Sequence, residues 1–118
     1  MADELRMAAI FREDCPLPPG KMAAQAGHAF ATALWQHPDE GLCQTYMENG
    51  QAKLVLIAPN LETLFKIAKR AKDRGVSAAM IKDQGRTVLN EPTFTVLGLG
   101  PMGRTDYNNL TRDLKLAE

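Results

Sequence analysis

The sequence predicts an α/β fold: a three-layer α/β/α sandwich with a four-stranded, mostly parallel mixed sheet and the element order β-α-α-β-α-β-β-α. Short apolar runs alternate with segments of helical periodicity, which is typical of this class. The run from Leu54 to Ile57 is apolar on both of its faces, as in strands that helices cover on both sides. With 118 residues and 45% hydrophobic content, the chain can bury one core, so we expect a single domain over residues 1–118.

The first half of the chain reads as a strand followed by two helices. Prolines follow the first apolar run, and proline is favoured at the first position of a helix. His37-Pro38 ends the long helix, and the shorter helix after it places Tyr46 and Met47 inward. The expected ranges are 5–11 for the strand, 20–35 for the long helix and 39–47 for the shorter helix.

The second half reads as three strands and two helices. Asn60 is a good N-cap, and the helix after it carries an inner apolar stripe that includes Leu64 and Phe65 and stops at Gly75. Thr105 is the expected cap of a last helix. The expected strands cover residues 53–58, 76–81 and 94–99.

Lys21, Gln25 and His28 form a polar stripe at the start of the long helix. Their spacing places them within an arc of roughly 60° at 100° per residue. Lys21 lies in the first turn, where the helix dipole disfavours a cation, so an anion that contacts both the ammonium and the free N–H groups would explain its position. The alternative is a polar face that simply points to water.

A second polar cluster, Asp83-Gln84-Gly85-Arg86-Thr87, lies between two apolar runs. It therefore falls in a loop at the end of a strand. Loops at strand ends carry functional residues more often than the strands themselves. The connection to the next strand is about a dozen residues long, which leaves room for a site.

Four segments in order span nearly the whole chain. They are Gly20-Lys21-Met22-Ala23-Ala24-Gln25 with His28-Ala29, Gly50-Gln51-Ala52-Lys53, Asp83-Gln84-Gly85-Arg86-Thr87, and Thr95-Val96-Leu97-Gly98-Leu99-Gly100-Pro101. Taken together, they resemble motifs of the type 2 peptidyl-tRNA hydrolase family, the archaeal and eukaryotic type, and occur in that family's order. The resemblance implies hydrolysis of the ester between peptide and tRNA, with peptidyl-tRNA as the partner, and it allows a homodimer.

By this resemblance, Lys21, Asp83, Thr87 and Thr95 fall at catalytic positions. Lys21 suits the binding of a phosphate or of the developing oxyanion, and the two threonine hydroxyls suit the positioning of water. Asp83 is expected to orient Lys21 or to accept a proton. The residues expected to bind substrate are Gly20, Gln25, His28, Gly85 and Arg86.

His28 leaves two interpretations open. An imidazole has an unperturbed pKa near neutrality, so His28 is a second candidate for the general base. The alternative, which we favour, is a histidine that holds its helix against its neighbours by a hydrogen bond, because no partner for it is visible in the sequence.

Two departures from the family pattern bear on the site. Gly27 takes the place of a larger residue within the helix motif, where glycine costs about 1 kcal/mol relative to alanine. This indicates close approach of another backbone or of a substrate. Glu91-Pro92 stands where the family has Pro-Gly and adds a carboxylate near the site.

The composition indicates a reducing compartment and no cofactor. Cys15 and Cys43 form no CxxC or Cys/His cluster, so neither a disulfide scaffold nor a zinc site is expected. The expected compartment is the cytoplasm, with no metal and no cofactor. No apolar run approaches the roughly 20 residues that span a bilayer, so no membrane partner is expected.

The charge balance keeps a second function class open. With 14 basic and 14 acidic residues the net charge is zero, whereas RNA binding draws on Lys and Arg. A local patch of Lys66, Lys69 and Arg70 beside Lys21 and Arg86 would supply that charge, unless the helix cations are only a solvated face. The alternative to a hydrolase is a non-enzymatic binding or regulatory module on the same fold.

Overall fold

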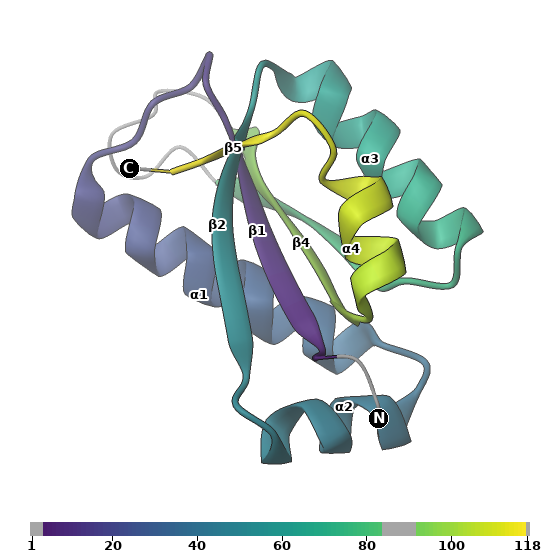
Figure 1. Ribbon diagram of the computed structural model, residues 1–118. Coiled ribbons are helices and arrows are strands. Elements are labelled where there is room, and N and C mark those ends of the chain that lie inside the picture. Colours follow the sequence, from purple (N-terminus) through teal and green to yellow (C-terminus); the bar gives the residue numbers. More distant parts are fainter. Residues whose placement is uncertain (1–3, 84–91, 118) are drawn as a thin grey trace.

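In the computed structural model, helices lie on both faces of one mixed sheet (Figure 1). The structure describes residues 4–83 and 92–117. Helix α1 lies on one face of the sheet, α3 and α4 lie on the other, and α2 lies near one end of the strands (Figure 1). The elements are β1 (Arg6–Arg12), α1 (Pro19–Gln36), α2 (Glu40–Glu48), β2 (Ala52–Ala58), α3 (Leu61–Asp73), β3 (Ala78–Asp83), β4 (Thr93–Met102), α4 (Arg104–Leu110) and β5 (Lys115–Leu116).

The sheet differs from the expected four-stranded, mostly parallel one. In the described residues it has five strands in the order β3-β4-β1-β2-β5, and only the β1–β2 pair is parallel. Strand β4 lies between β3 and β1 and runs antiparallel to both. An apolar run on both faces indicates that helices cover the strand on both sides. It does not indicate whether the strand runs parallel or antiparallel to its neighbours. The fifth strand has two residues and carries no periodic signal.

Two apolar clusters lie on opposite faces of the sheet because side chains alternate along β1. Ala8 and Ile10 point into the cluster under α3 and α4. Met7, Ala9 and Phe11 point into the cluster under α1 and α2. The expectation of helices on both faces is therefore met, although α2 contributes mainly one buried side chain, Tyr46.

Alanines let α1 approach β4 closely. Ala26, Ala29 and Ala33 are buried on the sheet side of α1. A Cβ atom added at Gly98 would lie only 2.3 Å from the Ala29 carbonyl oxygen, so β4 must have glycine at this position. Of the two explanations for Gly27, close approach of another backbone is wrong among the described residues, because no atom lies within 4 Å of a Cβ built there, and close approach of a substrate stays a prediction. The contact occurs instead through Ala29, two residues further along the helix.

The C-terminal end of α1 is tied to the sheet by two buried polar side chains. The Ser77 hydroxyl donates to the Ala33 carbonyl at 2.7 Å. His37 caps the helix; its Nδ1 accepts from the Asp39 N–H at 3.0 Å, and its Nε2 lies 3.1 Å from the Pro101 carbonyl oxygen. Because Nδ1 accepts, the proton of the neutral ring is on Nε2, which donates to Pro101. These bonds fix the direction of α1 over the sheet.

Three smaller expectations are corrected by the structure. Met47 and Phe65 were expected to face inward, but they are 47% and 46% exposed. Gly103, rather than Thr105, is the N-cap of α4.

Among the described residues, none of the helices has the length and apolar character needed to span a bilayer.

Candidate active site

The candidate site lies at the first turns of α1. Pro18 is the N-cap in an extended conformation, Pro19 begins the helix, and no side chain caps the first turn. The first turn also carries no acidic residue. Its free N–H groups and the helix dipole therefore favour an anion at this end.

Lys21 forms an ion pair with Asp83, the last residue of β3. The Lys21 Nζ lies 2.5 Å from the Asp83 Oδ1. The Asp83 side chain is 4% exposed and the Lys21 side chain is 17% exposed, so the carboxylate is covered while the lysine side chain keeps some contact with solvent. The sequence indicated that Lys21 needs an anion, and this carboxylate is the anion that it contacts.

Gln25 binds Thr95 of β4 one helical turn beyond Lys21. The Thr95 hydroxyl donates to the Gln25 Oε1 at 2.8 Å. Thr95 is 1% exposed and Gln25 is 9% exposed. Because Oε1 accepts this bond, the NH₂ group of Gln25 points to the other side of the amide, and the lone pairs of the threonine oxygen remain as acceptors.

A β-bulge places Thr95 on the α1 face of the sheet. Strands β3 and β4 pair Ile81 with Val96 and Lys82 with Phe94, so Thr95 is an extra residue on β4. A bulge of this kind re-aims a side chain. Phe94 packs on the opposite face against Phe65, with ring centroids 5.5 Å apart. The Lys21–Asp83 ion pair and the Gln25–Thr95 hydrogen bond thus lie along one side of α1. We call these four residues the α1 cluster.

Two other predicted site residues, His28 and Gly20, take no part in the two contacts of the α1 cluster. His28 is exposed, and its imidazole makes no hydrogen bond to any residue in the described ranges. Our favoured interpretation of His28 as a helix anchor is therefore wrong. Gly20 is exposed in the first turn of α1. Gly85, Arg86 and Thr87 lie outside the described residues.

Arg12 is a positioning residue that the sequence analysis missed. Its Nη1 donates to the Thr93 Oγ1 and to the Phe94 carbonyl, each at 3.0 Å. The other side of the guanidinium binds the Asp14 carboxylate at 2.8 and 3.1 Å. This hydrogen bond raises the pKa of Arg12 and lowers the pKa of Asp14.

Arg12 therefore ties the end of β1 to the start of β4, just before Thr95. A sequence signal was present, because Arg12 begins a charged run at the carboxyl end of a strand. Basic and acidic side chains placed there are candidates for holding a loop or strand end.

The α1 cluster supplies a cation, an amide and a hydroxyl at a helix N-terminus. The ammonium and the N–H groups can stabilise a developing negative charge. The threonine oxygen can accept a hydrogen bond from water and so orient it. Within residues 4–83 and 92–117, no group of three or more His, Cys, Asp and Glu side chains is arranged to hold a metal ion.

Comparisons with known proteins agree on one family. The family model described as peptidyl-tRNA hydrolase PTH2 matches residues 5–117. Among individual proteins, peptidyl-tRNA hydrolase 2 of Saccharomyces cerevisiae is 38% identical over 96% of this chain and 58% of its own length. Mitochondrial peptidyl-tRNA hydrolase 2 of Bos taurus is 36% identical over 96% of this chain and 64% of its own length. This chain therefore spans less than two thirds of the length of these two relatives.

A shorter relative matches along almost its whole length. Peptidyl-tRNA hydrolase of Methanopyrus kandleri is 34% identical over 91% of this chain and 93% of its own length. Among solved structures, a protein of unknown function from Agrobacterium tumefaciens has a TM-score of 0.60 at 14% identity and covers 98% of both chains, which shows a shared fold alone. The family model and the relatives together show that this chain belongs to the peptidyl-tRNA hydrolase PTH2 family.

Proposed function

We propose that this protein hydrolyses the ester bond of peptidyl-tRNA, releasing the peptide and recycling the tRNA. Membership of the peptidyl-tRNA hydrolase PTH2 family supports the reaction. The observation that carries the proposal is the Lys21–Asp83 ion pair beside the Thr95–Gln25 hydrogen bond at the start of α1. Ester hydrolysis needs an oriented water and a stabilised oxyanion, and these groups supply both.

In this proposal Asp83 acts through Lys21. The covered carboxylate holds the ammonium at the mouth of the site, where it faces the negative charge that develops on the ester oxygen. The bulge at Thr95 fixes the threonine oxygen where it accepts a hydrogen bond from the attacking water. The Gln25 NH₂ group donates to the substrate. Thr87, Gly85 and Arg86 are proposed members of the same site on the basis of the family resemblance.

The substrate of the test is an aminoacyl-tRNA whose amino group is acetylated. We expect the purified protein to release the acetylated amino acid from this tRNA in many turnovers. The matched control is the same aminoacyl-tRNA with a free amino group. It tests whether the protein requires a substrate whose amino group is blocked. Tight binding of the RNA without release of the acetylated amino acid would contradict the hydrolase. It would favour the alternative function, a non-enzymatic binding module, with which the neutral net charge is consistent.

We also propose a cytoplasmic location and a homodimer for this protein. Two free, half-buried cysteines, Cys15 and Cys43, support a reducing compartment. Trp35 on α1 is 86% exposed and offers an apolar side chain for a contact between two copies. Light scattering of the purified protein and of a Trp35→Ala variant tests the dimer.

A further inference from the structure

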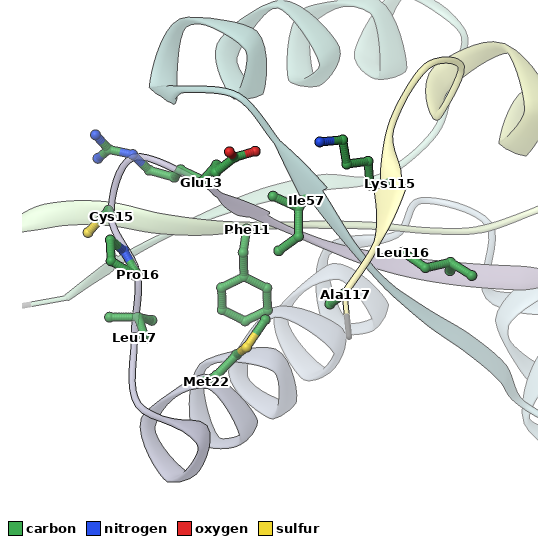
Figure 2. Close-up of a pocket in the computed structure, with 11 residues that line it drawn as sticks. Phe11, Glu13, Cys15, Pro16, Leu17, Met22, Ile57, Lys115, Leu116 and Ala117 are labelled. Atoms are coloured by element: carbon green, nitrogen blue, oxygen red, sulfur yellow. The ribbon is translucent and has the colours of Figure 1, made fainter.

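A cavity of about 400 Å³ lies beside the first turn of α1, over the carboxyl ends of β1 and β2 (Figure 2). Its volume lies within the range of about 300–1,000 Å³ that is usual for small-molecule sites. The segment between β1 and α1 forms one wall, and the C-terminal strand β5 forms another. We call this space the β5 cavity.

The β5 cavity has an apolar part and a charged part, the latter formed by Arg12, Glu13 and Lys115. Phe11 and Met22 point toward each other inside it, and Ile57 comes from β2 (Figure 2). Leu116 of β5 is 60% exposed and borders the same space. The charged side chains of Glu13 and Lys115 point away from Phe11 and Met22 (Figure 2). Flexible thioether and aliphatic walls adapt to apolar groups of different shapes.

The β5 cavity and the α1 cluster use neighbouring residues of α1, although no residue of the cluster lines the cavity. Met22, which lines the cavity, follows Lys21 directly in α1, and the Cα atoms of neighbouring residues are about 3.8 Å apart. The two side chains leave the helix about 100° apart, Lys21 toward Asp83 of β3 and Met22 toward β1. Arg12 also borders the cavity and binds the strand end that precedes Thr95. A group held in the cavity therefore contacts the residue that follows Lys21 in α1 and the arginine that holds the start of β4.

We propose that the β5 cavity binds the apolar side chain of the amino acid whose ester bond to tRNA is cleaved. The inference rests on the proposed function and makes Leu17, Met22 and Leu116 specificity-determining residues. Burial of apolar surface favours a large side chain there.

The experiment compares two substrates that share one tRNA body. The tRNA is charged with acetyl-leucine or with acetyl-glycine, and kcat/KM is measured for each. We expect the wild-type protein to prefer the leucyl substrate by about tenfold or more, as for other hydrophobic pockets that distinguish side chains of different size. In Leu116→Asp, which places a carboxylate at the wall, this ratio falls toward one.

Two further variants make the result decisive. Met47→Asp introduces the same charge at an exposed apolar position on α2, and its leucine-to-glycine ratio should equal that of the wild type. Leu17→Ser changes a different wall of the cavity and should lower the ratio even if Leu116→Asp fails to fold. Circular dichroism reports folding for each variant.

The outcomes separate this inference from the proposed function. An equal rate for both substrates in the wild type overturns the inference but leaves the hydrolase intact. Equal losses on both substrates in the cavity variants also overturn it, because the cavity then holds a part that all substrates share, such as the terminal adenosine. Failure of the wild type to cleave either substrate contradicts the hydrolase itself.

Discussion

At the scale of single residues, Thr95 reaches the site because β4 carries one extra residue. Strict alternation along β4 would put Thr95 and Val96 on opposite faces, but the bulge places both on the α1 side. The family resemblance identified Thr95, whereas the periodicity of the strand gave no signal for a bulge. The role of Thr95 in the site stays a prediction from the resemblance, whereas the bulge that orients its side chain could not be predicted from the sequence.

Thr95→Val should lower the hydrolysis rate by about 10²-fold, because valine has nearly the same shape but cannot orient water. Thr95→Ser keeps the hydroxyl and should retain most of the rate. Single-turnover kinetics on acetyl-aminoacyl-tRNA measure both. Thr111→Val is the matched control, since the Thr111 hydroxyl only binds the Tyr107 carbonyl on α4. A Thr95→Val variant as fast as the wild type would remove Thr95 from the reaction.

Tyr46 predicts how stability depends on alkaline pH. Burial raises the pKa of Tyr46 to about 12, and its hydroxyl donates to the Ala52 carbonyl at 2.9 Å. An exposed tyrosine in the unfolded chain has a pKa of about 10. The native state therefore favours the neutral form, and this contribution is complete below pH ~10 and is lost as the pH rises toward ~12.

Urea unfolding across this pH range measures the effect on the free energy of unfolding. We expect Tyr46→Phe to lose less stability between pH ~10 and ~12 than the wild type does, because it has no phenol to ionise. Equal pH dependence in Tyr46→Phe and the wild type would contradict the role given to Tyr46.

At the scale of elements, the boundaries of the first three helices were predictable, whereas the start of α4 and the strand directions were not. Asn60 caps α3 as expected, with its side chain accepting from the Thr63 N–H at 2.9 Å. Caps and prolines are local signals, so they can be read from a few residues. Strand direction depends on which strand inserts between which others, and β4 enters the sheet next to β1, far from it in sequence. No local pattern records that choice.

The contact between α1 and β4 predicts opposite effects for two glycine substitutions. Gly98→Ala should lower the free energy of unfolding by about 3 kcal/mol or more, because the new Cβ meets the Ala29 carbonyl and the helix must move. Gly27→Ala meets no atom and should raise it by about 1 kcal/mol, as alanine favours the helix. Chemical denaturation compares the two variants. A tolerated Gly98→Ala would show that α1 is free to shift away from the sheet.

At the scale of the whole molecule, the site combines residues from one helix and two strands. The family resemblance gave Lys21, Asp83 and Thr95 as candidate catalytic residues. In the structure they lie at the same end of α1. The pairing of Lys21 with Asp83 and of Gln25 with Thr95 depends on the register of β3 and β4, which the sequence does not reveal. His28 shows the limit of the spacing argument, because it shares the helical stripe but is exposed.

The basic side chains at the end of α3 form two groups, one that contacts α4 and one that is exposed to solvent. Arg70 donates to the Asn109 carbonyl and side chain at 2.6 and 2.9 Å, and Arg74 binds Asp106 at 2.8 Å. These two arginines hold α4 against α3. The exposed Lys69 and Lys72 are therefore better candidates for contacting tRNA phosphates than Arg70, which the sequence analysis included in the patch.

We predict that Lys69→Ala weakens tRNA binding and lowers the slope of log K against log salt by about one unit per lost phosphate contact. Fluorescence anisotropy with labelled tRNA over a range of salt concentrations measures the slope. Arg70→Ala should mainly lower thermal stability, since it releases α4. A wild-type affinity that is independent of salt would contradict tRNA as the partner.

The most direct test of the account is hydrolysis by the double variant Lys21→Gln/Asp83→Asn. Removing Lys21 alone would take the ammonium away from a covered carboxylate, and breaking a buried ion pair on one side typically costs about 3–5 kcal/mol of stability. The two neutral amides avoid that cost and can still form a hydrogen bond, so the melting temperature should stay near that of the wild type. We expect single-turnover release of acetyl-leucine from tRNA to fall by about 10²–10³-fold, because the cation facing the oxyanion is gone. A folded double variant that retains wild-type turnover would contradict the claim that this ion pair drives the reaction.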